Sequence, residues 1–309
     1  MSSACPLPQQ LHYLTRGSGE PLLLVHGLGS SGADWHFQVQ ALESSYRVIV
    51  PDLPGCGHSR PPSEGYTIAG FASSLWSLLD SLEASNPNIV GFSLGGAVAL
   101  EMALQRPQEV PRLVLINSLA CYRVDHWRKW LEARLPFALM HLLGMRRAAT
   151  LLAARMFPDP WQQAMRERAV AVIGAFPRAN YLAIVAALES WTATRRLDRL
   201  RSRVLMIAAE FDLTPLTEKR RLARELRAEL VVIRGSRHGT PFDAVTATNA
   251  CLLACLGDGM LPPEASRARD GPQHALSFQL AGSITEEHAG FAGFREDGAN
   301  LGTPTARIA

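Results

Sequence analysis

The sequence predicts an α/β fold in which a mostly parallel sheet is flanked by helices. Continuous apolar runs at residues 21–25, 47–50 and 113–116 are typical of strands that are covered on both faces. Stretches with apolar residues at helical spacing, such as residues 68–82, separate these runs. Strands that alternate with helices form a parallel sheet with right-handed crossovers. Ligands bind beyond the carboxyl ends of such strands, so the residues that follow each strand are candidates for a functional site.

The same alternation extends over most of the chain. In the first half we also expect strands at 11–15 and 88–92 and helices at 34–42 and 97–105. In the second half we expect strands at 203–209 and 230–233, a helix at 218–227 and a last helix that ends near residue 256. The two halves therefore contribute strands to one sheet.

Length and composition limit the class of protein. At 309 residues and 33.7 kDa, the chain is long for one compact domain and short for two large ones, so one domain with an insertion is expected. Hydrophobic residues make up 47% and charged residues 19%, which is typical of a soluble globular protein. The net charge of +3 is too small to indicate a nucleic-acid partner. The longest uncharged run, residues 84–100, contains a proline and three glycines, so no transmembrane span is expected.

The cysteines indicate a reducing compartment. The five cysteines are scattered and form no C-x-x-C pair, which favours reduced thiols in a cytoplasmic protein. Residues 1–10 have neither the basic nor the apolar region of a secretory signal. Cys251 and Cys255 lie four residues apart on an expected helix, but no histidine or second pair completes a metal site nearby, so core packing is favoured. No metal is predicted.

The strand pattern stops between residues 120 and 197, where several amphipathic helices are expected to form a lid. Residues 121–197 hold 12 Arg and Lys residues against 5 Asp and Glu residues, a net charge of about +7. Such a surface could favour an anionic substrate or a membrane surface, but a solvated helix face is the simpler interpretation. His126 and His141 in this segment are interpreted as packing or surface residues.

The pentapeptide Gly91-Phe92-Ser93-Leu94-Gly95 lies between an expected strand and an expected helix. In a G-x-S-x-G turn the serine is held in a strained conformation, and the two glycines leave room for the backbone to fold past itself. The helix that follows directs its free N–H groups toward whatever the serine attacks, so an oxyanion would be stabilised there. The pentapeptide also occurs by chance, but its position between a strand and a helix is the one that this chemistry requires. Ser93 is therefore predicted to be a nucleophile.

Asp212 and His238 each follow a strand of the second half and are therefore expected at the same sheet edge as Ser93. A neutral serine is a weak nucleophile that needs a base within hydrogen-bond reach, and His238 is the candidate for that base. Asp212 would accept the other ring N–H and stabilise the imidazolium. Glu210 is the alternative acid but is less favoured by its spacing, and the preceding strand is followed by Asn117 instead of an acid.

These residues resemble the α/β-hydrolase superfamily in the His26-Gly27-x-Gly29 loop, in the G-x-S-x-G turn and in the order Ser, Asp, His. The loops at 52–59 and 236–241 resemble that family's loop after its fourth strand and its histidine loop. The resemblance covers residues 11–256. It implies the α/β-hydrolase fold, with a helical cap inserted after the sixth strand, and an oxyanion hole made by the backbone N–H groups of Leu28 and Leu94.

The domains implied are a core made of residues 1–119 and 198–256, a cap at 120–197 and a tail at 257–309. The tail has 8 glycines and 4 prolines without a sustained period, so we expect it to be mostly disordered, with a short docked piece near 278–280. His274 and His288 lie in this tail and are poor catalytic candidates. His58, in the loop at 51–59, is interpreted as a structural or exposed residue.

The resemblance implies a serine hydrolase that acts on a small or medium apolar ester through an acyl-enzyme, without a cofactor. Serine at position 93 argues against dehalogenases and epoxide hydrolases, whose nucleophile is an aspartate. The loop at 26–29 also lacks the proline of the HGGPG loop in proline iminopeptidases. Enol-lactone hydrolysis, carbon–carbon bond hydrolysis and acyl transfer remain alternatives on the same residues, and a binding protein on the hydrolase scaffold is a further one. No oligomeric state is predicted.

Overall fold

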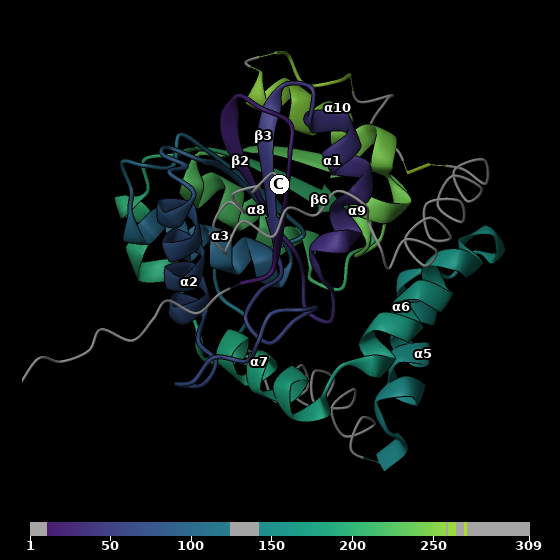
Figure 1. The fold of residues 1–309 in the computed structure, drawn as a ribbon. Helices are drawn as coiled ribbons and strands as arrows, with labels where there is room; N and C mark the ends of the chain where they lie inside the picture. The colour runs from purple at the N-terminus through teal and green to yellow at the C-terminus, as the bar shows by residue number, and fades with distance from the viewer. Residues whose placement is uncertain (1–10, 124–141, 258, 264–268, 271–309) are drawn as a thin grey trace, which may run out of the picture.

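A seven-stranded sheet forms the centre of the protein, in the order β1-β3-β2-β4-β5-β6-β7 (Figure 1). The computed structural model describes residues 11–123, 142–257, 259–263 and 269–270. The strands are β1 (Tyr13–Arg16), β2 (Glu20–Val25), β3 (Tyr46–Pro51), β4 (Asn88–Phe92), β5 (Arg112–Ile116), β6 (Arg203–Ala209) and β7 (Glu229–Ile233). The pair β1–β3 is antiparallel and every other pair is parallel. The predicted α/β-hydrolase fold, a mostly parallel sheet flanked by helices, is confirmed.

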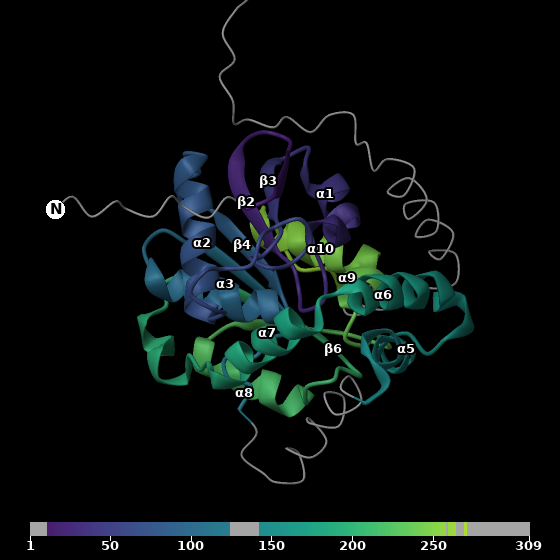
Figure 2. The ribbon, with the colours of Figure 1, turned by 60° about the horizontal axis from the view of Figure 1, so that its bottom comes forward.

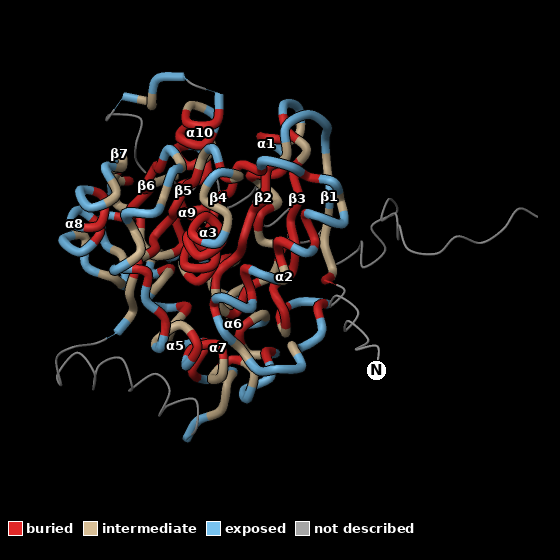
Figure 3. Tube along the Cα trace, turned by 90° about the vertical axis from the view of Figure 1, so that its left-hand side faces the viewer, coloured by how far each residue is buried: buried red, intermediate tan, exposed pale blue. Residues whose placement is uncertain are grey.

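Helices cover both faces of the sheet. Those outside the inserted segment are α1 (His36–Leu42), which continues the short 3-10 turn η1 (Gly32–Trp35), α2 (Ile68–Ser81), α3 (Leu94–Gln105), α8 (Leu216–Leu226), α9 (Thr240–Asp243) and α10 (Val245–Leu256). In β2, Leu23 and Val25 pack in the core layer that contains α2, α3 and α8, whereas Leu22 and Leu24 pack in the layer that contains α1 and α10. This alternation follows from the period of two in a strand. The central strands β4 and β5 and the helix α3 are buried, whereas β1 at the edge of the sheet is half-buried or exposed (Figure 3).

Two boundaries differ from those expected. The helix α3 begins at Leu94, directly after Ser93, because the two glycines that follow let it start in close contact with the sheet. An ideal Cβ on Gly95 would lie 2.1 Å from the carbonyl oxygen of Val25. The inserted helices follow β5, which is the strand expected at 113–116. It is the fifth of the described strands, whereas the resemblance implied the sixth. Within the described chain a single strand, the antiparallel β1, precedes β2.

The segment between β5 and β6 contains α5 (Met145–Met156), η2 (Pro160–Gln162), α6 (Gln163–Ala175), α7 (Arg178–Ser190) and η3 (Thr194–Arg199). Figure 2 shows α5, α6 and α7 on one side of the core, in front of it in that view. Ion pairs tie this segment to the core: Arg168 of α6 binds Asp34 at 2.7 Å, and Arg196 of η3 binds Glu101 of α3 at 2.7 Å. His126 and His141 lie outside the described residues.

No described helix is both long enough and apolar enough to cross a membrane by itself. The pair Pro160–Ala175 and Arg178–Ser190 meets that requirement only in combination, and it is bent by 98° at its break.

Two described residues of the segment after α10 contact the core and the inserted segment. The Arg269 N–H donates to the carbonyl of Arg234 at 3.0 Å, and the Asp270 N–H donates to that of Asp243 at 2.9 Å. The Arg269 guanidinium pairs with Asp159 and lies 5.8 Å from the centre of the Trp161 ring. Most of the predicted tail, including residues 278–280, His274 and His288, lies outside the described residues.

The described cysteines Cys56, Cys121, Cys251 and Cys255 form no disulfide bond, and Cys251 and Cys255 are buried in the core layer of α10. The described residues contain no cluster of His, Cys, Asp and Glu suited to a metal ion.

The close approach at Gly95 predicts that Gly95→Ala lowers the free energy of unfolding by about 3 kcal/mol or more. The added methyl group would overlap the carbonyl oxygens of Val25 and His26, at 2.1 and 2.5 Å, and backbone atoms cannot move aside as a side chain can. Urea denaturation followed by circular dichroism measures the loss.

Gly65→Ala is the matched control. Gly65 has a φ of +84°, and a Cβ there would meet nothing within 4 Å, so only the cost of the left-handed backbone, about 1 kcal/mol, is expected. Equal losses in the two variants would contradict the role given to Gly95.

Candidate active site

Ser93 occupies the turn between β4 and α3. Its backbone has φ 54° and ψ −114°, a strained conformation for a residue with a side chain. The cost of such a conformation is about 1–3 kcal/mol and is offset by the structure around it. Its N–H donates to the carbonyl of Ile116 at 2.9 Å, which fixes the turn against β5. The serine hydroxyl is therefore held at the carboxyl end of the central strands.

His238 follows β7 and contacts both predicted partners. Its Nε2 lies 3.0 Å from the Oγ of Ser93, and its Nδ1 lies 2.5 Å from the Oδ1 of Asp212. The imidazole also packs against the ring of Phe92, with 5.2 Å between ring centres. Three side chains that are far apart in the sequence are thus brought into one line of hydrogen bonds.

Asp212 follows β6, and its side chain is 1% exposed. Its Oδ1 also accepts from the Leu213 N–H at 2.7 Å, and its Oδ2 accepts from the Thr214 hydroxyl at 2.6 Å and from the ammonium of Lys219. Burial alone would raise the pKa of the Asp212 carboxyl, but His238 and Lys219 outweigh burial and hold that pKa below its usual value. Asp212 is therefore a carboxylate at neutral pH.

The alternative acid, Glu210, accepts a hydrogen bond from the Gly235 N–H at 2.8 Å. It supports the start of the histidine loop, residues 234–239, whereas Asp212 contacts the imidazole directly.

Asn117 has a role that the sequence did not reveal. It follows β5 with a φ of 49°, and its Nδ2 donates to the carbonyl of His238 at 2.8 Å and to the hydroxyl of Thr240 at 2.7 Å. Its Oδ1 accepts from the Ala209 N–H at 2.7 Å. The amide thus connects the ends of β5 and β6 to the histidine loop, where a carboxylate could not have donated.

Asp243 supports the histidine loop from within. Its side chain is buried, its Oδ1 accepts from the Ser236 hydroxyl at 2.7 Å, and its Oδ2 accepts from the Arg237 N–H at 3.1 Å. Burial raises the pKa of Asp243 to about 6, because two neutral donors do not replace the hydration of a carboxylate.

The glycine-rich loop at 26–32 is positioned by the buried ring of His26. Its Nδ1 donates to the carbonyl of Gly27 at 2.8 Å, and its Nε2 accepts from the Leu53 N–H at 3.0 Å, so the ring is neutral. Burial lowers the pKa of His26, in agreement with that tautomer. The loop that carries Leu28 is therefore tied to the loop after β3.

The loop after β3 is organised by Asp52. Its carboxylate accepts from the backbone N–H of Gly32 at 2.7 Å and of His58 at 2.9 Å. The exposed ring of His58 packs edge-on against the His12 ring, 4.8 Å away.

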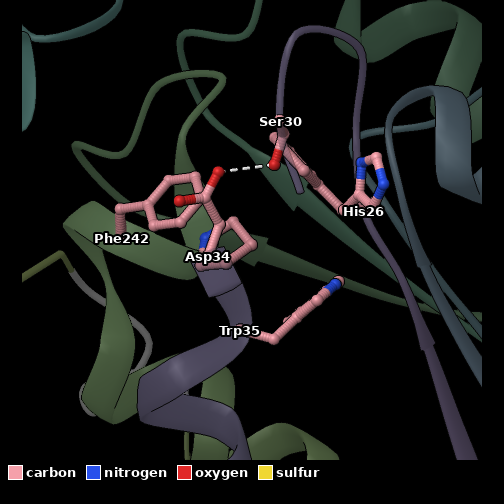
Figure 4. Close-up of a pocket in the computed structure, with 7 residues that line it drawn as sticks. His26, Ser30, Asp34, Trp35 and Phe242 are labelled. Carbon is pink, nitrogen blue, oxygen red and sulfur yellow. Dashed lines mark hydrogen bonds between the residues drawn. The ribbon is translucent and has the colours of Figure 1, made fainter. Parts of the chain in front are cut away.

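A small recess lies beside the glycine-rich loop (Figure 4). Its lining includes Trp35, Phe92 and Phe242, with a hydrogen bond of 2.5 Å from the Ser30 hydroxyl to Asp34 on one side. Ser93, Asp212 and His238 are not among the residues that line it.

The inserted segment reaches both loops of the site. A Cβ on Gly29 would lie 3.0 Å from Ile173 of α6 and 3.2 Å from Tyr181 of α7, and one on Gly239 would lie 2.7 Å from the ring of Phe157. The glycine-rich loop and the histidine loop are thus in contact with apolar side chains from between β5 and β6.

An α/β hydrolase is built on a mostly parallel sheet with a serine on the turn between a strand and a helix. A histidine and an aspartate lie at the same edge of that sheet, as they do here. The family model described as alpha/beta hydrolase fold matches residues 20–245. This chain therefore belongs to the α/β-hydrolase family.

Relatives of known name agree with this assignment. The chain is 34% identical over 246 residues to "Putative carbamate hydrolase RutD" of Variovorax paradoxus, which covers 76% of this chain and 91% of that protein. It is 30% identical over 256 residues to the protein of the same name in a Caulobacter species, covering 80% and 94%.

Solved structures agree as well. A hydrolase from Pseudomonas aeruginosa superposes with a TM-score of 0.71 at 29% identity, covering 80% of this chain and 94% of that one. An enol-lactonase from Burkholderia xenovorans has the same fold, with a TM-score of 0.71 at 24% identity and coverage of 80% and 96%.

Because the pKa of Asp243 is raised, the free energy of unfolding should depend on pH. An aspartate in an unfolded chain has a pKa of about 3.9, so the stabilisation from the bound proton is complete below about pH 4 and is lost as the pH rises through about 6. The free energy of unfolding of the wild type, relative to Asp243→Asn, should therefore fall by about 2–3 kcal/mol between pH 4 and pH 7. Urea denaturation at the two pH values measures it.

Asp198→Asn makes the same change at an exposed position in η3 and serves as the control. A difference between wild type and Asp243→Asn that does not change with pH would rule out a proton on Asp243.

Proposed function

We propose that this protein is a serine hydrolase that cleaves a carboxylic ester with a small or medium apolar acyl group through an acyl-enzyme. The observation that supports this most directly is the line of hydrogen bonds from Asp212 through His238 to Ser93, with the serine on a strained turn. Strain and a buried carboxylate both cost stability, and a nucleophile with its base accounts for both.

In the proposed reaction the Oγ of Ser93 attacks the ester carbonyl carbon while its proton passes to the Nε2 of His238. Asp212 accepts the Nδ1–H and stabilises the imidazolium. The tetrahedral intermediate then breaks its bond to the leaving oxygen, which takes the proton from His238. Water, activated by the same imidazole, hydrolyses the acyl-serine and releases the acid.

The proposed oxyanion hole consists of the backbone N–H groups of Leu94 and Leu28. The Leu94 N–H is the first of α3, and helix geometry gives it no acceptor within the helix. The close approach of Gly95 to the end of β2 puts the start of that helix beside the loop that carries Leu28. A donor of this kind is typically worth about 2.7–4 kcal/mol.

Residues 120–197 are proposed to form a cap over the site. The contacts of Ile173 and Tyr181 with Gly29, and of Phe157 with Gly239, support this proposal, because they put apolar surface against both loops of the site. Such a lining favours an apolar acyl group and helps to exclude water.

Carbamate hydrolysis is the second candidate, favoured by the name of the relatives with 34% and 30% identity. It uses the same nucleophile, base and oxyanion donors on a carbonyl that carries nitrogen. The two candidates therefore differ in the substrate and share the machinery.

Replacing the nucleophile is expected to abolish turnover. Ser93→Ala should lose at least about 10⁴-fold in kcat/KM toward aryl esters, because the acyl-enzyme cannot form. A fluorophosphonate probe should label wild type at Ser93, as located by peptide mass spectrometry, and should leave the variant unlabelled.

Ser118→Ala is the control, since this serine donates to the Ser93 carbonyl at 2.9 Å without contacting the imidazole. A folded Ser93→Ala protein that hydrolyses esters as fast as wild type would disprove the proposal.

A substrate panel separates the two candidates. Aryl esters from acetyl to decanoyl should give the highest kcat/KM at short or medium chain length, and the matched aryl carbamate should be slower by at least about tenfold. A lactone and a vinylogous diketone in the same panel, with Ser93→Ala as the blank, test the alternative hydrolyses. A carbamate that is the better substrate would favour the second candidate.

A further inference from the structure

A lysine is buried directly behind the acid of the site. Lys219 lies on α8, and its side chain is 0% exposed. Its ammonium contacts the Oδ2 of Asp212 and lies 3.3 Å from the Oδ1 of Asn117. Both partners belong to the site, because Asp212 holds the imidazole and Asn117 holds the loop that carries it.

Lys219 is not needed to satisfy the hydrogen bonding of Asp212. The carboxylate already receives the imidazole, the Leu213 N–H and the Thr214 hydroxyl. Burying an ammonium costs several kcal/mol unless it is paired, and an apolar side chain would fill the same space at lower cost. The buried ammonium of Lys219 is therefore not explained by stability alone, which points to a function in the site.

We propose that Lys219 is a positioning residue of the hydrolase: its ammonium fixes Oδ2 so that Oδ1 faces His238, and its charge offsets the charge of the Asp212 carboxylate beside the imidazole. A carboxylate beside an imidazole favours the imidazolium, and an imidazolium cannot accept the proton of a serine; a positive charge on the far side of the carboxylate opposes this effect. This inference rests on the proposed function.

The charges around Lys219 are few. The Asp212 carboxylate contacts the ammonium from the loop after β6, and His238 lies on the other side of that carboxylate. The charge of Asp212 also acts on the phenol of Tyr122. On α8 itself, Glu218 and Arg220 are exposed. In η3, which also packs against α8, the charged side chains are exposed, apart from Arg196, which is bound to Glu101. Burial lowers the pKa of Lys219, and its contact with Asp212 opposes that shift.

The test compares Lys219→Met with Lys219→Arg, which retains the charge. The second-order rate of labelling by a fluorophosphonate is measured from pH 5 to pH 9, because this reaction needs the base but no natural substrate. In Lys219→Met the rise of the labelling rate on the acidic side of the profile, its acidic limb, should shift to higher pH by about 1 unit. At the low-pH end of that limb the labelling rate should therefore be about tenfold lower than that of the wild type. Lys219→Arg should keep the limb of the wild type.

Thr214→Val is the matched control. It removes a neutral donor from the same Oδ2, so it should lower the rate at every pH without moving the limb. If circular dichroism shows that Lys219→Met is folded and its acidic limb lies at the same pH as that of the wild type, the inference is overturned. Wild type that is not labelled at all would instead overturn the proposed function.

A second measurement covers the case in which the lysine variants do not fold. Asp212→Asn leaves the ammonium without its charge partner, so this variant should lose more stability at pH 8 than at pH 10, where the lysine can give up its proton. The midpoint of urea unfolding, compared with wild type at each pH, gives the result, and equal losses at the two pH values would overturn the inference.

Discussion

The buried carboxylate of Asp212 is the interaction on which this site depends. A carboxylate with 1% of its side chain exposed is stable only where donors replace its hydration. The donors come from its own loop and, through His238, from the histidine loop, and the ammonium of Lys219 on α8 adds a positive charge. Satisfying this one charge therefore fixes how β6, α8 and the loop after β7 lie relative to one another, and the direction of the imidazole follows.

The nucleophile is fixed by packing instead of by charge. Ser93 has a positive φ because α3 begins against the end of β2, and that contact requires glycine at position 95. The strand between the two halves of the site, β5, contacts both: Ile116 accepts from the Ser93 N–H, and the Asn117 that follows it hydrogen-bonds to Ala209 of β6 and to His238. A small error in either half would break the contact of 3.0 Å between Ser93 and His238, which explains why so many buried polar groups support the loops.

Motif and strand order were sufficient to predict the fold, the family and the meeting of Ser93, Asp212 and His238, because parallel strands bring their carboxyl ends to one edge. Lys219 was missed although a signal exists: it lies three and four residues before Leu222 and Ala223, which are buried on α8, so it shares their face. The roles of Asn117 and Asp243 had no such signal, since both depend on contacts with the histidine loop, and spacing does not define the path of that loop. The contacts of Arg269 could not be predicted either, because no periodic pattern surrounds it.

The charge of the inserted segment gains a structural interpretation. Sequence alone left its excess of arginine as a solvated face, and several arginines, such as Arg146 and Arg178, are indeed exposed. Others bind within the protein: Arg168 pairs with Asp34 beside the glycine-rich loop, and Arg196 pairs with the buried Glu101 of α3. Both pairs join an arginine of the basic inserted segment to a carboxylate of the core. Because the guanidinium groups of Arg168 and Arg196 hold α6 and η3 against the core, Ile173 and Tyr181 are kept in contact with the glycine-rich loop at Gly29.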